Sequence, residues 1–185
     1  MRYDVYIHQD KILDDLGEIF DDLNNHTIIE HVADDLMKIT ILLDLEEELV
    51  DLNMVHASIM SDFGVDTTMV YVKDNVYYYL SQSLIIEKVR HLDTAVYDIS
   101  GLLLELSKNK NTKVNIKRHM VDYIGQENID TILMIAKKNM NLSVTAKKLY
   151  LHRNSLNYRI DKIHQKTDVD VKKFRGLRAL VSILE

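Results

Sequence analysis

The chain has 185 residues, 46% of them hydrophobic, which is enough for one moderate domain or two small ones with a buried core. It contains no cysteine, which excludes a disulfide framework, a thiolate nucleophile and a cysteine-ligated zinc site. The N-terminus does not have the pattern of a signal peptide, and no apolar run approaches the ~20 residues of a membrane span. We therefore expect a soluble, cytoplasmic protein.

The net charge of −6 is unevenly distributed along the chain. Residues 1–106 contain 6 Lys and Arg against 22 Asp and Glu, a net charge of −16. Residues 107–185 contain 17 against 7, a net charge of +10. A basic region attracts a phosphate backbone and an acidic one repels it, so the division favours nucleic-acid binding by the C-terminal part.

The beginning of the chain alternates between strand and helix patterns. Residues 2–7 could form a short strand, apolar residues at helical spacing predict a helix over 12–23, and an apolar run predicts a buried strand over 36–43. The other side of the helix carries carboxylates, at Asp14, Asp15, Glu18, Asp21 and Asp22. Clustered carboxylates can bind a divalent cation, but along a helix they are more typical of a solvated face.

A helix and a β-hairpin are predicted next. The helix runs from about residue 46 to 63, with acidic residues in its first turn and Gly64 at its end. Two segments, 67–72 and 76–80, flank the turn 73–75 and predict the hairpin. The order strand, helix, strand, turn, strand is typical of the start of a ferredoxin-like sandwich, so we expect a small N-terminal α/β sandwich.

Residues 82–108 carry an apolar stripe that predicts one long amphipathic helix, about 40 Å in length. The stripe has a four-three spacing over three heptads, formed by Ile85, Val89, Leu92, Val96, Ile99, Leu103 and Leu106. A small domain cannot easily bury both ends of such a helix, so we predict that the stripe is the dimerisation seam of a homodimer. The alternative is two helices, broken near residues 93–94 and packed on the protein's own sheet.

Residues 142–163 have the pattern of two short helices joined by a tight turn. Each helix has one apolar face, formed by Leu142, Ala146 and Leu149 in the first and by Leu156, Ile160 and Ile163 in the second. The outer face of the second helix carries amides, hydroxyls and cations, as a helix in the DNA major groove requires. We predict base readout by Asn154 and Asn157, and phosphate or base contacts by Arg153, Tyr158 and Arg159. The alternative is a helical hairpin whose outer face is merely solvated.

The same stretch resembles the C-terminal helix-turn-helix of the bacterial PucR/CdaR-type transcription regulators. The resemblance is carried by Thr145-Ala146, Leu149, His152-Arg153-Asn154-Ser155-Leu156 and Tyr158-Arg159-Ile160, against the family's TA-x-x-L-x-x-H-R-N-T-L-x-Y-R-L. It implies sequence-specific binding of double-stranded DNA through the helix that begins at Arg153. The candidate DNA-binding residues are Thr145, His152, Arg153, Asn154, Ser155, Asn157, Tyr158, Arg159 and Lys162.

Regulators of this type often carry a degenerate relative of the cyclase palm domain ahead of the DNA-binding part. In active cyclases a carboxylate after the first strand and a carboxylate-rich hairpin turn hold the catalytic metals. We place Asp44 in the first position, whereas the turn Lys73-Asp74-Asn75 lacks the Gly-Gly-Asp/Glu-Glu-Phe signature. The resemblance therefore implies a non-catalytic sensor or dimerisation module, and we expect no catalytic residue, metal or cofactor.

The sequence analysis therefore predicts an α+β protein with three parts. An acidic α+β domain for sensing or dimerisation spans residues 1–108, a linker spans 109–127, and an all-α helix-turn-helix domain spans 128–185. We expect a dimeric, sequence-specific transcription regulator, with a possible small-molecule effector of unknown identity. One alternative is a leucine-rich protein-interaction adaptor with a vestigial helix-turn-helix. Another is a metal-dependent nucleotide enzyme built around Asp44, although the chain has no glycine-rich phosphate loop.

Overall fold

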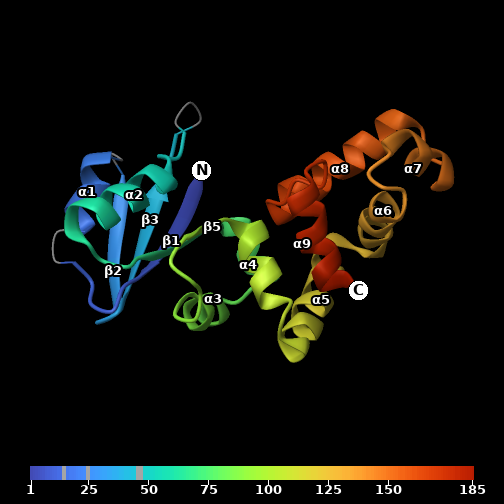
Figure 1. The fold of residues 1–185 in the computed structure, drawn as a ribbon. Helices are drawn as coiled ribbons and strands as arrows, with labels where there is room; N and C mark the ends of the chain where they lie inside the picture. The colour runs from blue at the N-terminus through green and yellow to red at the C-terminus, as the bar shows by residue number, and fades with distance from the viewer. Residues whose placement is uncertain (14–15, 24–25, 45–47) are drawn as a thin grey trace. The chain divides into compact units, whose positions relative to one another are not determined.

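The computed structural model describes residues 1–13, 16–23, 26–44 and 48–185 and shows a mixed α+β protein (Figure 1). The chain forms two compact units. The N-terminal unit consists of residues 1–74 and 82–98, and the C-terminal unit of residues 75–81 and 99–185. The short segment 75–81 thus joins the C-terminal unit although the residues on both sides of it belong to the other one.

The N-terminal unit is built on a five-stranded sheet of order β2-β3-β1-β4-β5. The strands are β1 (Arg2–His8), β2 (Thr27–Ala33), β3 (Leu36–Leu42), β4 (Thr68–Lys73) and β5 (Val96–Tyr97). Neighbouring strands are antiparallel except β4 and β5, which are parallel. The first four strands have the ferredoxin-like order, which confirms the predicted fold class.

Helices α1 (Leu16–Leu23) and α2 (Leu52–Phe63) contribute to the main core of this unit, and α3 (Gln82–Val89) contacts β1 and β4. Alternate residues of the sheet, such as Val5 and Ile39, are fully buried in that core together with Phe20 of α1. The alternation follows from the pleat, which places every second side chain on the same face. Of the carboxylates expected along α1, Glu18 is exposed, whereas Asp14, Asp15 and the side chains of Asp21 and Asp22 lie outside the described residues.

Helix α2 begins later than predicted. Its first residue is Leu52, because the Asp51 carboxylate accepts a hydrogen bond from the backbone N–H of Asn53 and so caps the helix. Residues 48–51 are not helical, and residues 45–47 lie outside the described part of the chain. At the other end Gly64 has a φ of 66°, the left-handed conformation expected of a helix C-cap.

The predicted hairpin over 67–80 is wrong. Residues Asp74–Tyr78 form a short 3-10 helix, η1, and the hairpin of this unit is β2–β3 instead. Val76, Tyr79 and Leu80 are buried, at the i, i+3, i+4 spacing of a helical turn rather than the alternation of a strand. The sequence did not reveal β2 because it is an edge strand with no buried residue and no regular alternation of apolar and polar side chains.

The predicted long helix over 82–108, and with it a continuous dimer seam, is also wrong. Helix α3 ends at Val89, and α4 (Ile99–Leu106) begins only after β5. The backbone N–H of Met69 donates to the carbonyl of Ala95, and Val96 pairs with β4, so sheet hydrogen bonds replace the helical ones. Five residues of the apolar stripe are at most 3% exposed within the single chain, namely Ile85, Val89, Ile99, Leu103 and Leu106. Leu92 and Val96 are half-buried.

The C-terminal unit is all-α apart from the η1 segment. Its helices are α4, α5 (Lys110–Ile124), α6 (Gln126–Lys137), α7 (Leu142–Lys148), α8 (Arg153–Thr167) and α9 (Phe174–Leu184). Helix α9 contacts α4, α5 and α6 and is largely buried, so it forms the centre of this unit. None of the helices in the described ranges is long and apolar enough to cross a membrane.

The segment expected to be a linker, 109–127, is mostly the helix α5. The side chain of Asn109 caps this helix by accepting hydrogen bonds from the backbone N–H groups of Asn111 and Thr112. Ile116, Met120 and Ile124 then recur every four residues and are buried. A polar, basic surface on this helix concealed the apolar stripe from the sequence analysis.

Candidate nucleic-acid interface

Helix α7 is the first helix of the helix-turn-helix. Asn141 caps its start, since the side-chain oxygen accepts a hydrogen bond of 3.0 Å from the backbone N–H of Val144. Thr145 is fully buried, and its hydroxyl donates to the carbonyl of Asn141 at 2.9 Å. Thr145 therefore stabilises the first turn of α7 and does not reach the surface, contrary to its expected place among the DNA contacts.

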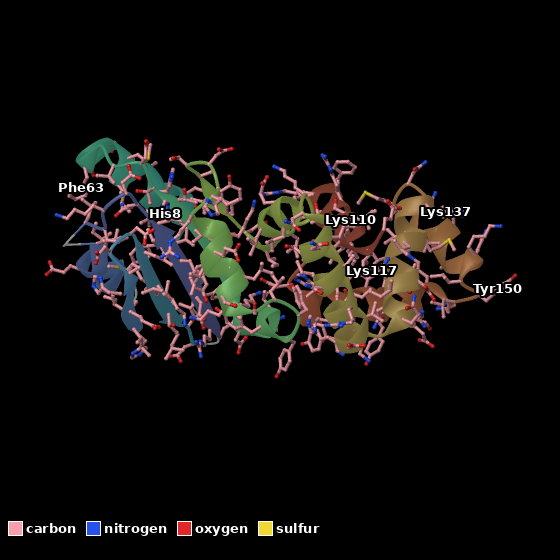
Figure 2. All side chains as sticks on the ribbon, turned by 90° about the horizontal axis from the view of Figure 1, so that it is seen from below. His8, Phe63, Lys110, Lys117, Lys137 and Tyr150 are labelled. Carbon is pink, nitrogen blue, oxygen red and sulfur yellow. The ribbon has the colours of Figure 1, made fainter. Side chains whose placement is uncertain are left out.

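The turn between α7 and α8 depends on an unusual backbone conformation. Tyr150 has a φ of 54°, in the left-handed region that a non-glycine residue occupies at a cost of about 1–2 kcal/mol. Its side chain is 96% exposed and projects from the turn into solvent (Figure 2). Sequence analysis did not single out this residue, because a tyrosine gives no local signal for a positive φ.

His152 is the N-cap of α8. Its Nδ1 atom accepts a hydrogen bond of 3.3 Å from the backbone N–H of Asn154, which satisfies one of the free N–H groups at the helix start. This role requires that Nδ1 carries no proton. The imidazole thus fixes where α8 begins, and the ring itself is exposed.

The outer face of α8 is accessible, as the DNA-binding interpretation requires. Tyr158 is 72% exposed, and Arg153, Asn154, Ser155 and Lys162 are also exposed. Asn157 is half-buried. The inner face carries Leu156, Ile160 and Ile163, each at most 1% exposed, as the apolar spacing predicted. The helix therefore presents an accessible polar surface over its first three turns.

Arg159 points toward α6 and not along the outer face. Its guanidinium donates to the Thr131 hydroxyl at 3.2 Å and to the Glu127 carboxylate at 3.1 Å. The Arg159 side chain is 24% exposed, whereas that of Glu127 is 83% exposed. The arrangement joins α8 to α6. It also closes one side of a polar hollow of about 510 Å³ lined by Glu127, Asn128, Asn154, Ser155, Tyr158, Arg159 and Lys162.

Asp44, which the resemblance placed in the position of a cyclase metal ligand, does not follow the first strand of the sheet. Asp44 follows β3, whereas the residues after the first strand are Gln9 and Asp10. The turn of the β2–β3 hairpin carries Asp35, which accepts hydrogen bonds from the Arg90 guanidinium at 2.8 and 2.9 Å. These bonds lower the pKa of Asp35. Among the described residues, no group of three or more His, Asp or Glu side chains is arranged to hold a metal ion.

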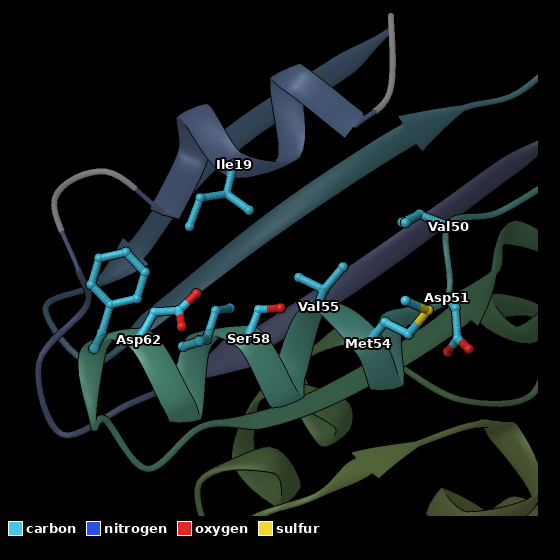
Figure 3. Close-up of a pocket in the computed structure, with 9 residues that line it drawn as sticks. Ile19, Val50, Asp51, Met54, Val55, Ser58 and Asp62 are labelled. Carbon is cyan, nitrogen blue, oxygen red and sulfur yellow. The ribbon is translucent and has the colours of Figure 1, made fainter.

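The N-terminal unit also has an apolar groove between α1 and α2 (Figure 3). Its volume is about 540 Å³, and Ile19, Val55 and Ile59 form part of its lining. Asp51 and Asp62 belong to the opposite ends of α2 and also line the groove.

The comparison with known families identifies the domain that the C-terminal helices form. Residues 129–184 match the profile of the PucR C-terminal helix-turn-helix domain. This stretch is a PucR-type helix-turn-helix domain. The matched region contains all nine residues expected to bind DNA, and it begins within α6 and ends with α9. The identification confirms the resemblance inferred from the motif.

Two individual proteins are also similar to the chain. A stretch of 76 residues is 41% identical to the "Uncharacterized protein YxkF" of Bacillus subtilis (strain 168). The alignment covers 40% of this chain and 26% of that protein, so the match spans about a quarter of the relative's length. The crystal structure of a regulator of polyketide synthase expression from Bifidobacterium adolescentis is 13% identical, with a TM-score of 0.46. That alignment covers 99% of this chain and 78% of the other.

Proposed function

We propose that this protein is a transcription regulator that binds specific double-stranded DNA sequences through α8. The observation that carries the proposal is the exposed polar face of α8 within a PucR-type helix-turn-helix domain. In such motifs the N-terminal residues of the second helix contact base edges in the major groove. The capped start at His152 would hold the backbone of these residues in a defined position.

Within this face the side chains divide by chemistry. Asn154 stands in the first turn and can pair bidentately with adenine, and Asn157 is the second candidate for base readout. Arg153, Tyr158 and Lys162 carry groups that bind phosphate oxygens. Ser155 could contact either. Arg159 remains a candidate for a DNA contact, but only if binding displaces its guanidinium from Glu127 and Thr131.

The experiment has two stages. DNA bound by the protein is first recovered from fragmented genomic DNA, and binding to a recovered sequence is then measured by fluorescence anisotropy at several salt concentrations. The affinity should fall with a log–log slope of about −0.9 for each neutralised phosphate. No salt-dependent DNA binding would favour the protein-interaction adaptor. Turnover of a nucleoside triphosphate with magnesium would favour the enzyme.

Asn154→Ala then tests sequence specificity. The substitution should cost about 1–3 kcal/mol at one base pair and leave the affinity for other sequences nearly unchanged. Asn115→Ala is the matched control, because Asn115 is an exposed asparagine on α5. An equal loss on all sequences would assign Asn154 to the DNA backbone instead.

We also propose a homodimer, since helix-turn-helix proteins commonly bind two half-sites as dimers. The stripe over residues 85–106 cannot supply a continuous seam, because most of it is buried within one chain. A dimer would therefore use another surface. Analytical ultracentrifugation with and without DNA tests this, and a monomer under both conditions would refute it.

A further inference from the structure

The segment between β4 and α3 contacts the end of α8 that lies farthest from His152. We call residues 75–79 the strap. The Asn75 amide Nδ2 donates to the carbonyl of Gln165 at 2.7 Å, and the Tyr79 hydroxyl donates to the carbonyl of Thr167 at 2.7 Å. Both carbonyls belong to the last turn of α8, where four carbonyls lack a partner within the helix. The strap therefore supplies two of the hydrogen bonds that the helix end requires.

Aromatic contacts strengthen this attachment. The ring of Tyr78 stacks on that of Tyr123, at the end of α5, with 4.7 Å between centroids and an interplanar angle of 13°. The Lys166 ammonium donates to the Tyr123 carbonyl at 2.6 Å and lies 4.8 Å from the centroid of its ring. The strap, the end of α5 and the end of α8 thus form one cluster within the C-terminal unit.

The strap also has unusual chain connections. It follows directly from β4, which pairs with β1 along its length, and it leads into α3, which contacts both of these strands. The chain on both sides of the strap therefore belongs to the N-terminal unit, whereas the contacts of Asn75 and Tyr79 with α8 are within the C-terminal unit.

We propose that Asn75 and Tyr79 are positioning residues for DNA binding, which orient α8 through their hydrogen bonds to its last turn. The proposal rests on the proposed function. Thr167 lies 13 residues beyond Asn154 in α8, which is about 20 Å along the helix axis. At that length, a tilt of about 3° displaces the other end by about 1 Å. Such a displacement breaks the bidentate pairing of the short Asn154 side chain with a base, whereas the longer, flexible side chains of Arg153 and Lys162 can still reach phosphate oxygens.

Burial makes Tyr79 suited to this role. Its side chain is 3% exposed, so the hydroxyl cannot exchange its bond to Thr167 for one to water. The Asn75 side chain donates to the carbonyl of Gln165 through Nδ2. Its Oδ1 atom is buried without a hydrogen-bond partner in the described structure. Loss of either side-chain donor would leave a carbonyl of the last α8 turn without that partner.

The test compares Tyr79→Phe with Tyr78→Phe in the full chain, on a DNA sequence that the unmodified protein binds specifically. Each substitution removes one phenol hydroxyl, but that of Tyr79 is buried, whereas Tyr78 is 68% exposed and retains its stacking as phenylalanine. Affinity is measured where circular dichroism shows every variant to be fully folded. We expect Tyr79→Phe to weaken specific binding at least fivefold, with unchanged non-specific affinity and salt dependence. Tyr78→Phe should stay within twofold.

Asn75→Ala provides a second variant if Tyr79→Phe does not fold, and it should act in the same direction, with Asn115→Ala as control. Wild-type specific affinity in folded Tyr79→Phe and folded Asn75→Ala would overturn the proposal. If the two residues have only a structural role, the substitutions will lower the unfolding midpoint and leave the DNA affinity of the folded protein unchanged. That result would also overturn the proposal. Failure of the unmodified chain to bind DNA would instead refute the proposed function.

Discussion

Arg159→Ala separates two roles that the sequence could not distinguish, a DNA contact and a link between α8 and α6. The Arg159–Glu127 ion pair should contribute at most about 1 kcal/mol, because the Glu127 side chain is 83% exposed and screened by water. The hydrogen bond to Thr131 joins a charged group to a fully buried residue, and such bonds contribute about 1.5–3 kcal/mol. The Thr131 hydroxyl also donates to the carbonyl of Glu127, which reduces the loss. We therefore expect destabilisation of about 1–2 kcal/mol.

The assay combines urea unfolding, followed by circular dichroism, with DNA binding as a function of salt. Glu127→Gln is the matched control, since it removes the ion pair but leaves Arg159 bonded to Thr131, and it should cost less than about 0.5 kcal/mol. If Arg159 links the helices, Arg159→Ala lowers the stability and leaves the salt slope unchanged. An unchanged stability together with a salt slope reduced by about 1 would refute this reasoning and assign Arg159 to a phosphate.

Three further predictions concern stability. Gly176→Ala would place a Cβ atom 2.3 Å from the backbone oxygen of Asp170, so it should lower the unfolding free energy by about 1–3 kcal/mol in urea titrations; an unchanged midpoint would contradict this. The hydrogen bond from Arg90 lowers the pKa of Asp35 in the folded protein. The contribution of this ion pair to the free energy of unfolding is therefore present above about pH 4 and is lost as the pH falls through the lowered pKa of Asp35. Arg90→Met should remove this acid dependence in thermal unfolding curves, and an identical pH profile would count against it. Burial raises the pKa of Tyr79 well above its usual value. The contribution of the neutral Tyr79 side chain to the stability of the folded protein is therefore present below about pH 10 and decreases at higher pH. Tyr79→Phe should therefore leave the tyrosinate absorbance of the folded protein unchanged at pH 10 to 11, and a lower absorbance would contradict the burial argument.

The helix-turn-helix was predictable from the sequence because its determinants are local. Leu156, Ile160 and Ile163 follow the helical period, and all three are buried as expected. The ferredoxin-like class was also correct, but the predicted hairpin was assigned to the wrong segments. The hairpin in the structure is formed by β2 and β3. Because β2 is an edge strand, it is defined by its hydrogen bonds to β3 more than by a pattern in its own sequence.

The errors share a physical cause, which is that distant partners decide the local structure. The apolar heptads over 82–108 are compatible with one helix, but Val96 pairs with Met69 of β4, which lies 27 residues earlier in the chain, and this pairing interrupts the helix. Thr145 has the chemistry of a DNA contact, yet its hydroxyl bonds to the backbone of its own helix. Arg159 faces α6 because Thr131 and Glu127 lie there, and spacing alone cannot show this.

The place of the strap in the chain has a consequence for dissecting the molecule. A fragment that starts at residue 99 would retain every helix from α4 to α9 but would lack Val76, Tyr79 and Leu80, whose side chains are at most 3% exposed. Their removal would leave voids and expose apolar surface, so such a fragment should aggregate or unfold more readily. The helices from α4 to α9 should therefore not be transferable to another protein on their own. Chimaeras joined at residue 99 should need the 75–81 peptide supplied in trans.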